Sequence, residues 1–334
     1  MRINFLRSAV LTLMAALLAA LLGSAANADV LGNRDMPVRT ELHPIQTLWI
    51  TDQQFLTGDS NGRQVTVSGQ LSIPQGSGRL PTVILMHGSG GMGGNVAYWT
   101  RQLNAMGIAT FAIDGMTGRG LTGVGSNQAV LGRLNFIVDI YRSLDILAKH
   151  PRVDPERIAL MGFSRGGQAS LYASVERFHK MWNTGGAQFA AYIAFYPDCA
   201  TTYSGDTQVV AKPIRIFHGT PDDYNPVRTC KVYQERLLKA AKIDIEITEY
   251  PNAAHGFDNP LGAVPARAAA NDQSVRECTI REGEGGNLLN VSTSQTFTYK
   301  DDCVKLGPIV GHDAEATAQA TKAVADFLKQ AFKL

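Results

Sequence analysis

The sequence lacks any run of like charges, any basic stripe, and any internal repeat or low-complexity linker. Its 31 Lys+Arg residues nearly balance its 29 Asp+Glu residues, so neither nucleic acid nor an anionic membrane surface is favoured as a partner. Beyond the first residues it also lacks an apolar run long enough to cross a bilayer. What is present, 45% hydrophobic residues in a chain of 334, is typical of a globular protein that buries a core.

The N-terminal segment has the parts of a secretory signal peptide. Two arginines precede an apolar stretch at residues 9–22, and Ala26 and Ala28 are the small residues that signal peptidase accepts. The alternative is an uncleaved membrane anchor, but the apolar stretch is shorter than the roughly 20 residues that a span needs. We therefore predict a signal peptide at residues 1–28 and an exported protein, periplasmic or secreted, with no membrane association after cleavage.

The four cysteines show neither CxxC nor Cys/His metal spacing. An exported protein meets an oxidising environment, where an even number of thiols usually pairs. Three connectivities are possible, and the pairs closest in sequence are Cys199 with Cys230 and Cys278 with Cys303. We predict these two structural disulfides, because the second would also restrain a segment with little core of its own.

The apolar runs predict an α/β fold. Two β-rich runs, at residues 45–50 and 65–73, favour an antiparallel start. Short continuous apolar runs follow, separated by segments long enough for helices, which predicts a mostly parallel sheet covered by helices on both faces. The expected strands are residues 81–86, 108–113, 158–161, 191–195, 214–217 and 244–250, and the expected helices are residues 96–106, 135–149, 167–177, 227–241 and 314–332.

Two stretches interrupt this pattern. Residues 116–128 are rich in glycine, and residues 259–308 are polar, poorly periodic and longer than most loops inside compact domains. Since no linker separates two halves of the chain, we predict a single catalytic domain at residues 29–334, with a disulfide-restrained excursion near residues 259–308.

A serine flanked by glycines carries the main chemical signal. Gly162-Phe163-Ser164-Arg165-Gly166 lies directly after the expected strand 158–161 and directly before a helical segment. A nucleophile elbow needs glycines two residues on either side of the serine, because the strained turn leaves no room for a Cβ. The alternative is a glycine-rich turn with an N-capping serine. The position between strand and helix favours Ser164 as a nucleophile.

A serine hydroxyl needs a base, which this kind of elbow takes from later in the chain. His255 lies in a loop just past the expected strand 244–250, at the edge of the sheet where the base belongs. The other three downstream histidines are less suitable as the base. His218 ends a strand and is expected to pack, and His312 is interpreted as a residue at the start of a helix. His179 follows the nucleophile helix too closely in sequence to reach back to the serine. We therefore predict His255 as the base.

The acid that orients the base should follow the preceding strand. Asp222 and Asp223 both stand there, and the alternative is that both form a turn with Pro221. From the residues alone, one of the two carboxylates is catalytic and the other local.

An oxyanion hole needs two backbone N–H groups. Arg165 follows the nucleophile, and Ser89 lies in a glycine-rich loop after an earlier strand, so we expect their N–H groups to form it. That loop lacks the ending of a P-loop and the context of a dinucleotide site. His87, His218 and His255 have no metal-ligand spacing. We predict no metal and no cofactor.

Several of these residues belong to motifs that occur in one order along the chain. The motifs are His87-Gly88-x-Gly90-Gly91, Gly162-x-Ser164-x-Gly166-Gly167, His218-Gly219-x-x-Asp222 with Pro226, and Pro251 through His255-Gly256-Phe257. Over nearly all of the mature chain, the sequence resembles the dienelactone hydrolase family of α/β-hydrolases. The resemblance implies the α/β-hydrolase fold, the triad roles of Ser164, Asp222 and His255, and the pairing of Cys199 with Cys230 seen in exported relatives.

Ser164 stands where dienelactone hydrolases proper carry a cysteine, and no acidic residue lies in the loop of Ser89. A Ser-His-Asp triad remains suited to ester cleavage or acyl transfer. We predict an exported serine hydrolase that cleaves a small-molecule carboxylic ester or lactone through an acyl-enzyme. Alternatives are a peptidase of the prolyl-oligopeptidase type, for whose propeller the chain has no room, and a non-catalytic binding protein, which should have lost a triad member. The residues flanking the catalytic loops, and therefore expected in the substrate pocket, are Met92, Phe163, Tyr196, Tyr224 and Phe257.

Overall fold

The structure is a computed structural model of the whole chain and describes residues 37–334. The predicted signal peptide, residues 1–28, lies outside the described residues. Within residues 37–334, no helix is both long enough and apolar enough to span a membrane.

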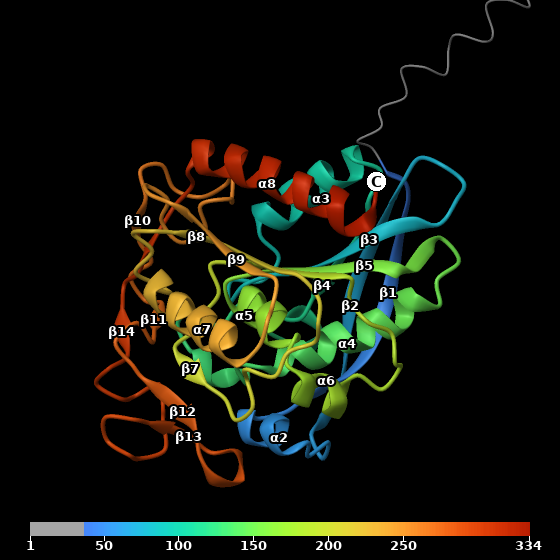
Figure 1. Cartoon of the computed structure of the whole chain (residues 1–334). Coiled ribbons are helices and arrows are strands. Elements are labelled where there is room, and N and C mark those ends of the chain that lie inside the picture. Colours follow the sequence, from blue (N-terminus) through green and yellow to red (C-terminus); the bar gives the residue numbers. More distant parts are fainter. Residues whose placement is uncertain (1–36) are drawn as a thin grey trace, which may run out of the picture. The chain divides into compact units, whose positions relative to one another are not determined.

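An eight-stranded sheet lies at the centre of the described chain (Figure 1). Most of its strands are short runs of buried residues, as a sheet covered on both faces requires. In spatial order the strands are β1 (Pro37–Trp49), β2 (Arg63–Pro74), β4 (Ala109–Asp114), β3 (Leu80–Met86), β5 (Val153–Phe163), β6 (Ala191–Phe195), β8 (Ile214–Gly219) and β9 (Ile245–Tyr250).

The strand directions match the two patterns in the sequence, the β-rich start and the later apolar runs separated by helices. β1 pairs antiparallel with β2, and β2 pairs antiparallel with β4. From β4 to β9 each neighbouring pair is parallel. The predicted α/β class, with an antiparallel start and a mostly parallel sheet, is confirmed. Because β4 and β5 flank β3 on opposite sides, the winding reverses between β3 and β5, and ligand sites of open α/β sheets lie at such a reversal.

Helices cover both faces of the sheet (Figure 1). The α-helices of the described chain are α2 (Asp52–Thr57), α3 (Gly94–Ala105), α4 (Asn135–Ala148), α5 (Arg165–Tyr172), α6 (Glu176–Trp182), α7 (Val227–Ala240) and α8 (Ala314–Phe332). Side chains of α3 and α8, such as Trp99 and Leu328, share one buried cluster with one face of the sheet. Those of α4, α5 and α7, such as Leu144, Leu171 and Tyr233, belong to a second buried cluster on the other face.

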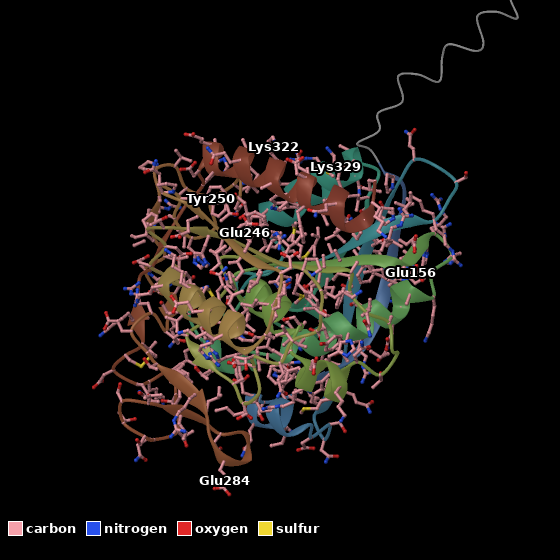
Figure 2. All side chains as sticks on the ribbon, in the orientation of Figure 1. Glu156, Glu246, Tyr250, Glu284, Lys322 and Lys329 are labelled. Carbon is pink, nitrogen blue, oxygen red and sulfur yellow. A yellow bond between two sulfur atoms is a disulfide. The ribbon has the colours of Figure 1, made fainter. Side chains whose placement is uncertain are left out.

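The C-terminal helix α8 shows how the sequence specifies such a cover. Asp313 caps its N-terminus by accepting a hydrogen bond from Ala316 N at 2.9 Å. Lys322 and Lys329 project from its outer side (Figure 2), with 81% and 59% of their side chains exposed. The residues of its buried stripe recur every three or four positions. They are Ala316, Ala320, Val324, Phe327 and Leu328.

One predicted helix is two helices in the structure. The sequence pattern predicts one helix over residues 167–177, but the chain turns between α5 and α6. Val175 has an extended backbone and forms an isolated β-bridge with Val209. The apolar pattern of the sequence continues through both helices and therefore predicts one. The break comes from the pairing of Val175 with a distant residue, which the local pattern does not show.

The predicted excursion, residues 259–308, folds into small ribbons. Each of its strands has two or three residues, so no period is visible in the sequence. Glu284 is exposed at its outer end (Figure 2). The strands and short turns are β10 (Arg267–Ala268), β11 (Gln273–Ser274), β12 (Ile280–Glu282), η3 (Glu284–Gly286), β13 (Leu288–Asn290), β14 (Lys305–Leu306) and β15 (Ile309–Val310).

Pairing to the rest of the chain holds the excursion in place. β12 pairs in parallel with β7 (Thr201–Thr202), which follows β6. Val310 forms a β-bridge with His255, and Gly311 N donates to His255 O at 3.1 Å. The end of the excursion therefore lies directly against the loop that carries the predicted base.

The four cysteines are joined in the two pairs expected from the sequence. Cys199 bonds to Cys230, and Cys278 bonds to Cys303. The first pair ties α7 to the segment after β6, within the larger buried cluster. The second closes 25 residues of sequence inside the excursion. Cys278 belongs to the same cluster and Cys303 packs against it, so the second disulfide fastens the excursion where the excursion meets the core.

Candidate active site

Ser164 lies in a sharp turn between β5 and α5. Its backbone has φ 55° and ψ −116°, a conformation that is costly for a residue with a Cβ. Two glycines allow the turn to close. A Cβ on Gly162 would lie 1.9 Å from Gly166 O, and one on Gly166 would lie 2.1 Å from Met86 O. The turn therefore places the Ser164 hydroxyl at the carboxyl edge of the sheet.

Hydrogen bonds link Ser164, His255 and Asp222 in one line. Ser164 Oγ donates to His255 Nε2 at 2.9 Å, and His255 Nδ1 donates to Asp222 Oδ2 at 2.8 Å. These contacts correspond to a neutral imidazole with its proton on Nδ1. His255 is 5% exposed and Asp222 is 3% exposed, so little water competes for these bonds. The structure thus brings together the three residues that the sequence analysis selects.

Asp222 is held as a carboxylate. Its Oδ1 accepts hydrogen bonds from Tyr224 N and Asn225 N, each at 2.9 Å. Burial alone would raise the pKa of Asp222, but the charges and hydrogen bonds of His255 and His218 outweigh burial and hold the pKa well below its usual range. Asp222 therefore remains ionised beside the imidazole at any pH near neutral.

Asp223 turns the other way. Its Oδ2 lies 3.2 Å from Arg276 Nη1, and its Oδ1 accepts from Ile309 N at 2.7 Å. Arg276 and Ile309 both belong to or border the excursion. The two adjacent carboxylates therefore divide their contacts, since Asp222 binds the histidine and Asp223 anchors the excursion.

The structure reveals two polar residues near the line that the sequence analysis did not select. His218, expected only to pack, is fully buried, donates from Nε2 to Asn225 O at 2.6 Å and lies 3.4 Å from Asp222 Oδ2. Asp258 is also fully buried; it accepts from Trp99 Nε1 at 2.7 Å and from the hydroxyl of Tyr196. For Asp258, the one available sequence signal is its place three residues after His255.

The two predicted oxyanion residues lie near Ser164, since Ser89 lines the same cavity and Arg165 follows Ser164 directly in the chain. Within residues 37–334, neither Ser89 N nor Arg165 N donates to a protein acceptor, so both N–H groups remain available to a ligand. His87 fixes the loop of Ser89 because its Nδ1 donates to Gly88 O at 2.7 Å and its Nε2 accepts from Gly115 N at 3.0 Å. Burial lowers the pKa of His87, which keeps the ring in this neutral form.

The Arg165 side chain is a structural brace. Its Nε donates to Ser89 Oγ, its Nη1 to Leu131 O and Gly132 O, and its Nη2 to the backbone and side-chain oxygens of Gln128. These contacts use all five N–H groups of the guanidinium. The side chain therefore holds the loop of Ser89 in place and has no donor left for a substrate.

A cavity of about 280 Å³ borders Ser164 and His255. Of the five predicted pocket residues, Phe163, Tyr196 and Tyr224 line it. The other two lie elsewhere. Met92 is 45% exposed to solvent, and Phe257 is fully buried against the Tyr196 ring. The excursion and the residues beside it supply the opposite wall, which the sequence analysis did not predict. These wall residues are Asn259, Gly262, Ala263, Asp272, Val310 and Gly311.

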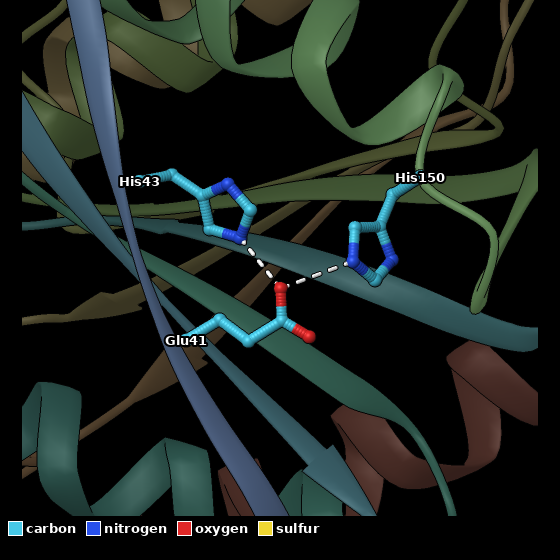
Figure 3. A group of neighbouring side chains, drawn as sticks. All are labelled: Glu41, His43 and His150. Carbon is cyan, nitrogen blue, oxygen red and sulfur yellow. Dashed lines mark hydrogen bonds and ion pairs between the residues drawn. The ribbon is translucent and has the colours of Figure 1, made fainter.

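One group of three potential metal ligands occurs within residues 37–334, formed by Glu41, His43 and His150. Figure 3 shows both rings turned to the same oxygen, with Nε2 of His43 and of His150 at 3.1 and 3.2 Å from Glu41 Oε2. Arg152 N donates to His150 Nδ1, whereas a metal-bound histidine normally donates from its second nitrogen. Arg39 also lies 2.8 Å from Glu41 Oε1. The donor set is therefore arranged as a hydrogen-bonded cluster that joins β1 to the segment before β5.

Comparisons with known proteins give one family and several similar folds. The model of the dienelactone hydrolase family matches residues 67–280. Among solved structures, a dienelactone hydrolase-like promiscuous phosphotriesterase from metagenomic libraries is 18% identical, with a TM-score of 0.54 over 87% of this chain and 98% of that chain. The protein m3DLH is also 18% identical, with a TM-score of 0.56 over the same shares.

A third similar structure is MGS-M1, an α/β hydrolase enzyme from a Medee basin deep-sea metagenome library. It is 14% identical, with a TM-score of 0.50 over 88% of this chain and 99% of that chain. A search of curated protein sequences gave no match. At these identities, the structural likeness establishes a shared fold.

Proposed function

We propose that this chain, which belongs to the dienelactone hydrolase family, is an exported serine hydrolase that cleaves carboxylic esters through an acyl-enzyme. Family membership supports ester hydrolysis. The observation that carries the finer proposal is the unbroken hydrogen-bonded line from Ser164 Oγ through His255 to Asp222. A base within 2.9 Å of a hydroxyl, itself oriented by a buried carboxylate, is the arrangement that activates serine.

The reaction follows from these contacts. Ser164 Oγ attacks the ester carbonyl carbon while His255 Nε2 takes the hydroxyl proton, and Asp222 stabilises the resulting imidazolium. The carbonyl oxygen becomes an oxyanion that accepts hydrogen bonds from Ser89 N–H and Arg165 N–H. His255 then returns the proton to the leaving alcohol. Water, deprotonated by His255, then attacks the acyl carbon, and the imidazolium returns that proton to Ser164 Oγ as the acid leaves.

Export is supported by the cysteines. Both pairs lie at bonding distance in the structure, and disulfides persist in oxidising compartments. A cavity of about 280 Å³ fits a small ester better than a long peptide, so esterase activity is favoured over peptidase activity. An intact hydrogen-bonded line likewise favours catalysis over non-catalytic binding.

The test uses a fluorophosphonate probe, which needs an activated serine and the oxyanion groups together. The mature protein should be labelled at Ser164 and should hydrolyse p-nitrophenyl esters of short acyl chains. Ser164→Ala should lose the label and lower kcat by up to about a million-fold. Ser126→Ala removes an exposed serine of the glycine-rich segment and serves as the control that keeps both properties. A folded Ser164→Ala protein that is still labelled would refute the assignment.

A further inference from the structure

Asp272 places a carboxylate in the wall of the active-site cavity. It lies between β10 and β11 of the excursion and lines the same cavity as Ser164 and His255. The backbone opposite is Gly125, where a Cβ would lie 2.5 Å from an Asp272 carboxylate oxygen. The Asp272 carboxylate therefore packs directly against the backbone of Gly125.

This carboxylate has no cation of its own. Among residues 37–334, no lysine or arginine forms an ion pair with Asp272, and its one side-chain hydrogen bond is a long one from the Tyr224 hydroxyl at 3.4 Å. By contrast, the fully buried Asp139 is paired with Arg119 at 2.8 Å. Partial burial also raises the pKa of Asp272. A half-buried charge that lacks a partner is unfavourable until a ligand supplies one.

No cation elsewhere in the cavity offsets Asp272. Within the described chain, no lysine or arginine lines the cavity. The Arg165 guanidinium lies behind Ser89 with all its N–H groups in use. A substrate carboxylate would therefore meet a like charge and no lysine or arginine that could neutralise its own.

A cationic substrate would meet favourable groups. Tyr196 and Tyr224 line the cavity, and their rings lie beside the His255 ring at 4.6 and 4.5 Å between centroids. Aromatic faces and a carboxylate together are the groups that bind ammonium ions. Both lie beside the serine that the ester must reach.

We propose that Asp272 makes this site select esters that carry an ammonium group and reject esters that carry a carboxylate. The proposal rests on the hydrolase function proposed above and specifies the substrate class. The cation would pair with the Asp272 carboxylate while the ester carbonyl lies against Ser164. Asp272 takes no part in bond making, so it determines specificity without entering the reaction.

The experiment compares matched esters on the mature protein. Acetylcholine and its neutral isostere 3,3-dimethylbutyl acetate differ in one charge, as do monomethyl and dimethyl succinate. We expect kcat/KM to favour acetylcholine over its isostere by about tenfold, and monomethyl succinate to be the poorer of its pair. Both preferences should weaken as KCl is added, because salt screens the charge. Asp272→Asn should bring both ratios close to one, because the charged esters lose the group that distinguishes them from the neutral ones.

Glu277→Gln is the matched control, since Glu277 is an exposed carboxylate of the same excursion, outside the cavity, that pairs with Lys305. It should leave both ratios unchanged. The proposal is overturned if the wild type hydrolyses the neutral esters but shows ratios near one, or if Asp272→Asn slows all four esters equally, which would mean a structural role. The salt series needs no variant and decides the case should Asp272→Asn not fold. A wild type that cleaves none of the esters and takes no fluorophosphonate label would refute the hydrolase function itself.

Discussion

The two walls of the active-site cavity are built in different ways. One wall follows the ends of β3, β5, β8 and β9, strands whose buried side chains belong to the two large hydrophobic clusters. The other comes from the excursion, whose strands have two or three residues. The first wall carries the groups that would break an ester, and the second carries Asp272, the charge that would choose one. The strand-borne wall is therefore positioned by the central sheet, whereas the excursion wall is positioned by short ribbons that pack against the core through residues such as Ile280 and Leu288.

The adjacent pair Asp222 and Asp223 marks the border between the walls. Asp222→Asn should keep the fold yet lower kcat by about 10⁴ near neutral pH, because the imidazole loses the acceptor that fixes its tautomer and its charge. Asp223→Asn should change kcat little, since this side chain holds Arg276 and Ile309 N. Steady-state kinetics and thermal melts of both variants test this division of roles between Asp222 and Asp223. A normally folded Asp223→Asn enzyme with no activity would reverse the division of roles.

Removing each disulfide in turn tests the comparison between the strand-borne wall and the excursion wall. The loop-entropy estimate gives about 3 to 4 kcal/mol for closing either loop, whose sequence separations are 31 and 25 residues. Replacing Cys278 and Cys303 by alanine should also raise KM several-fold with little change in kcat, because it loosens the excursion wall. Replacing Cys199 and Cys230 should lower the free energy of unfolding without that change in KM.

Urea unfolding and ester kinetics on the two double variants give both quantities. If the pair within the excursion altered kcat and left KM unchanged, the idea that this wall acts on binding alone would be wrong. Peptide mapping without reduction first establishes that the wild-type pairs are those described.

The smallest expected effect is a change in how the free energy of unfolding depends on pH, caused by His87 in the strand-borne wall. Burial lowers the pKa of His87 in the folded state, so below the unfolded value of about 6.5 the unfolded chain binds a proton that the folded chain does not. The free energy of unfolding should therefore fall as pH drops below about 6.5, by at most about 1.4 kcal/mol per pH unit from this residue. His87→Asn should reduce that slope, measured by urea unfolding at several pH values. An equal slope in both proteins would assign the pH dependence to other groups.

The strand-borne wall was largely predictable from the sequence. Continuous apolar runs fix a parallel sheet, and parallel strands present their carboxyl ends at one edge. A serine, an aspartate and a histidine that each follow such a strand are therefore expected to be close together. The contact between His218 and Asp222 was not predictable. A histidine at the end of a buried strand has the same local sequence whether it lies beside a carboxylate or only packs.

The excursion wall was not predictable. Asp272 lies between strands too short to show a period, and its place opposite Gly125 depends on pairing between segments far apart in the chain. The same reason explains Met92 and Phe257, which flank the right loops but point to solvent and to the core. Proximity in sequence locates a loop, whereas the direction of each side chain depends on the backbone of that loop.

The two ends of the excursion meet at one point. Gly311 N donates to His255 O at 3.1 Å, and Asp313 N donates to Phe257 O at 3.0 Å. The chain therefore leaves and re-enters the sheet-based part of the fold side by side, and doubling the length of such a loop costs only about 0.6 kcal/mol in closure entropy. A change of length or charge between these two bonds would therefore alter one wall of the cavity while leaving the sheet that holds Ser164 unchanged, provided that residues such as Ile280 and Leu288 still cover the core.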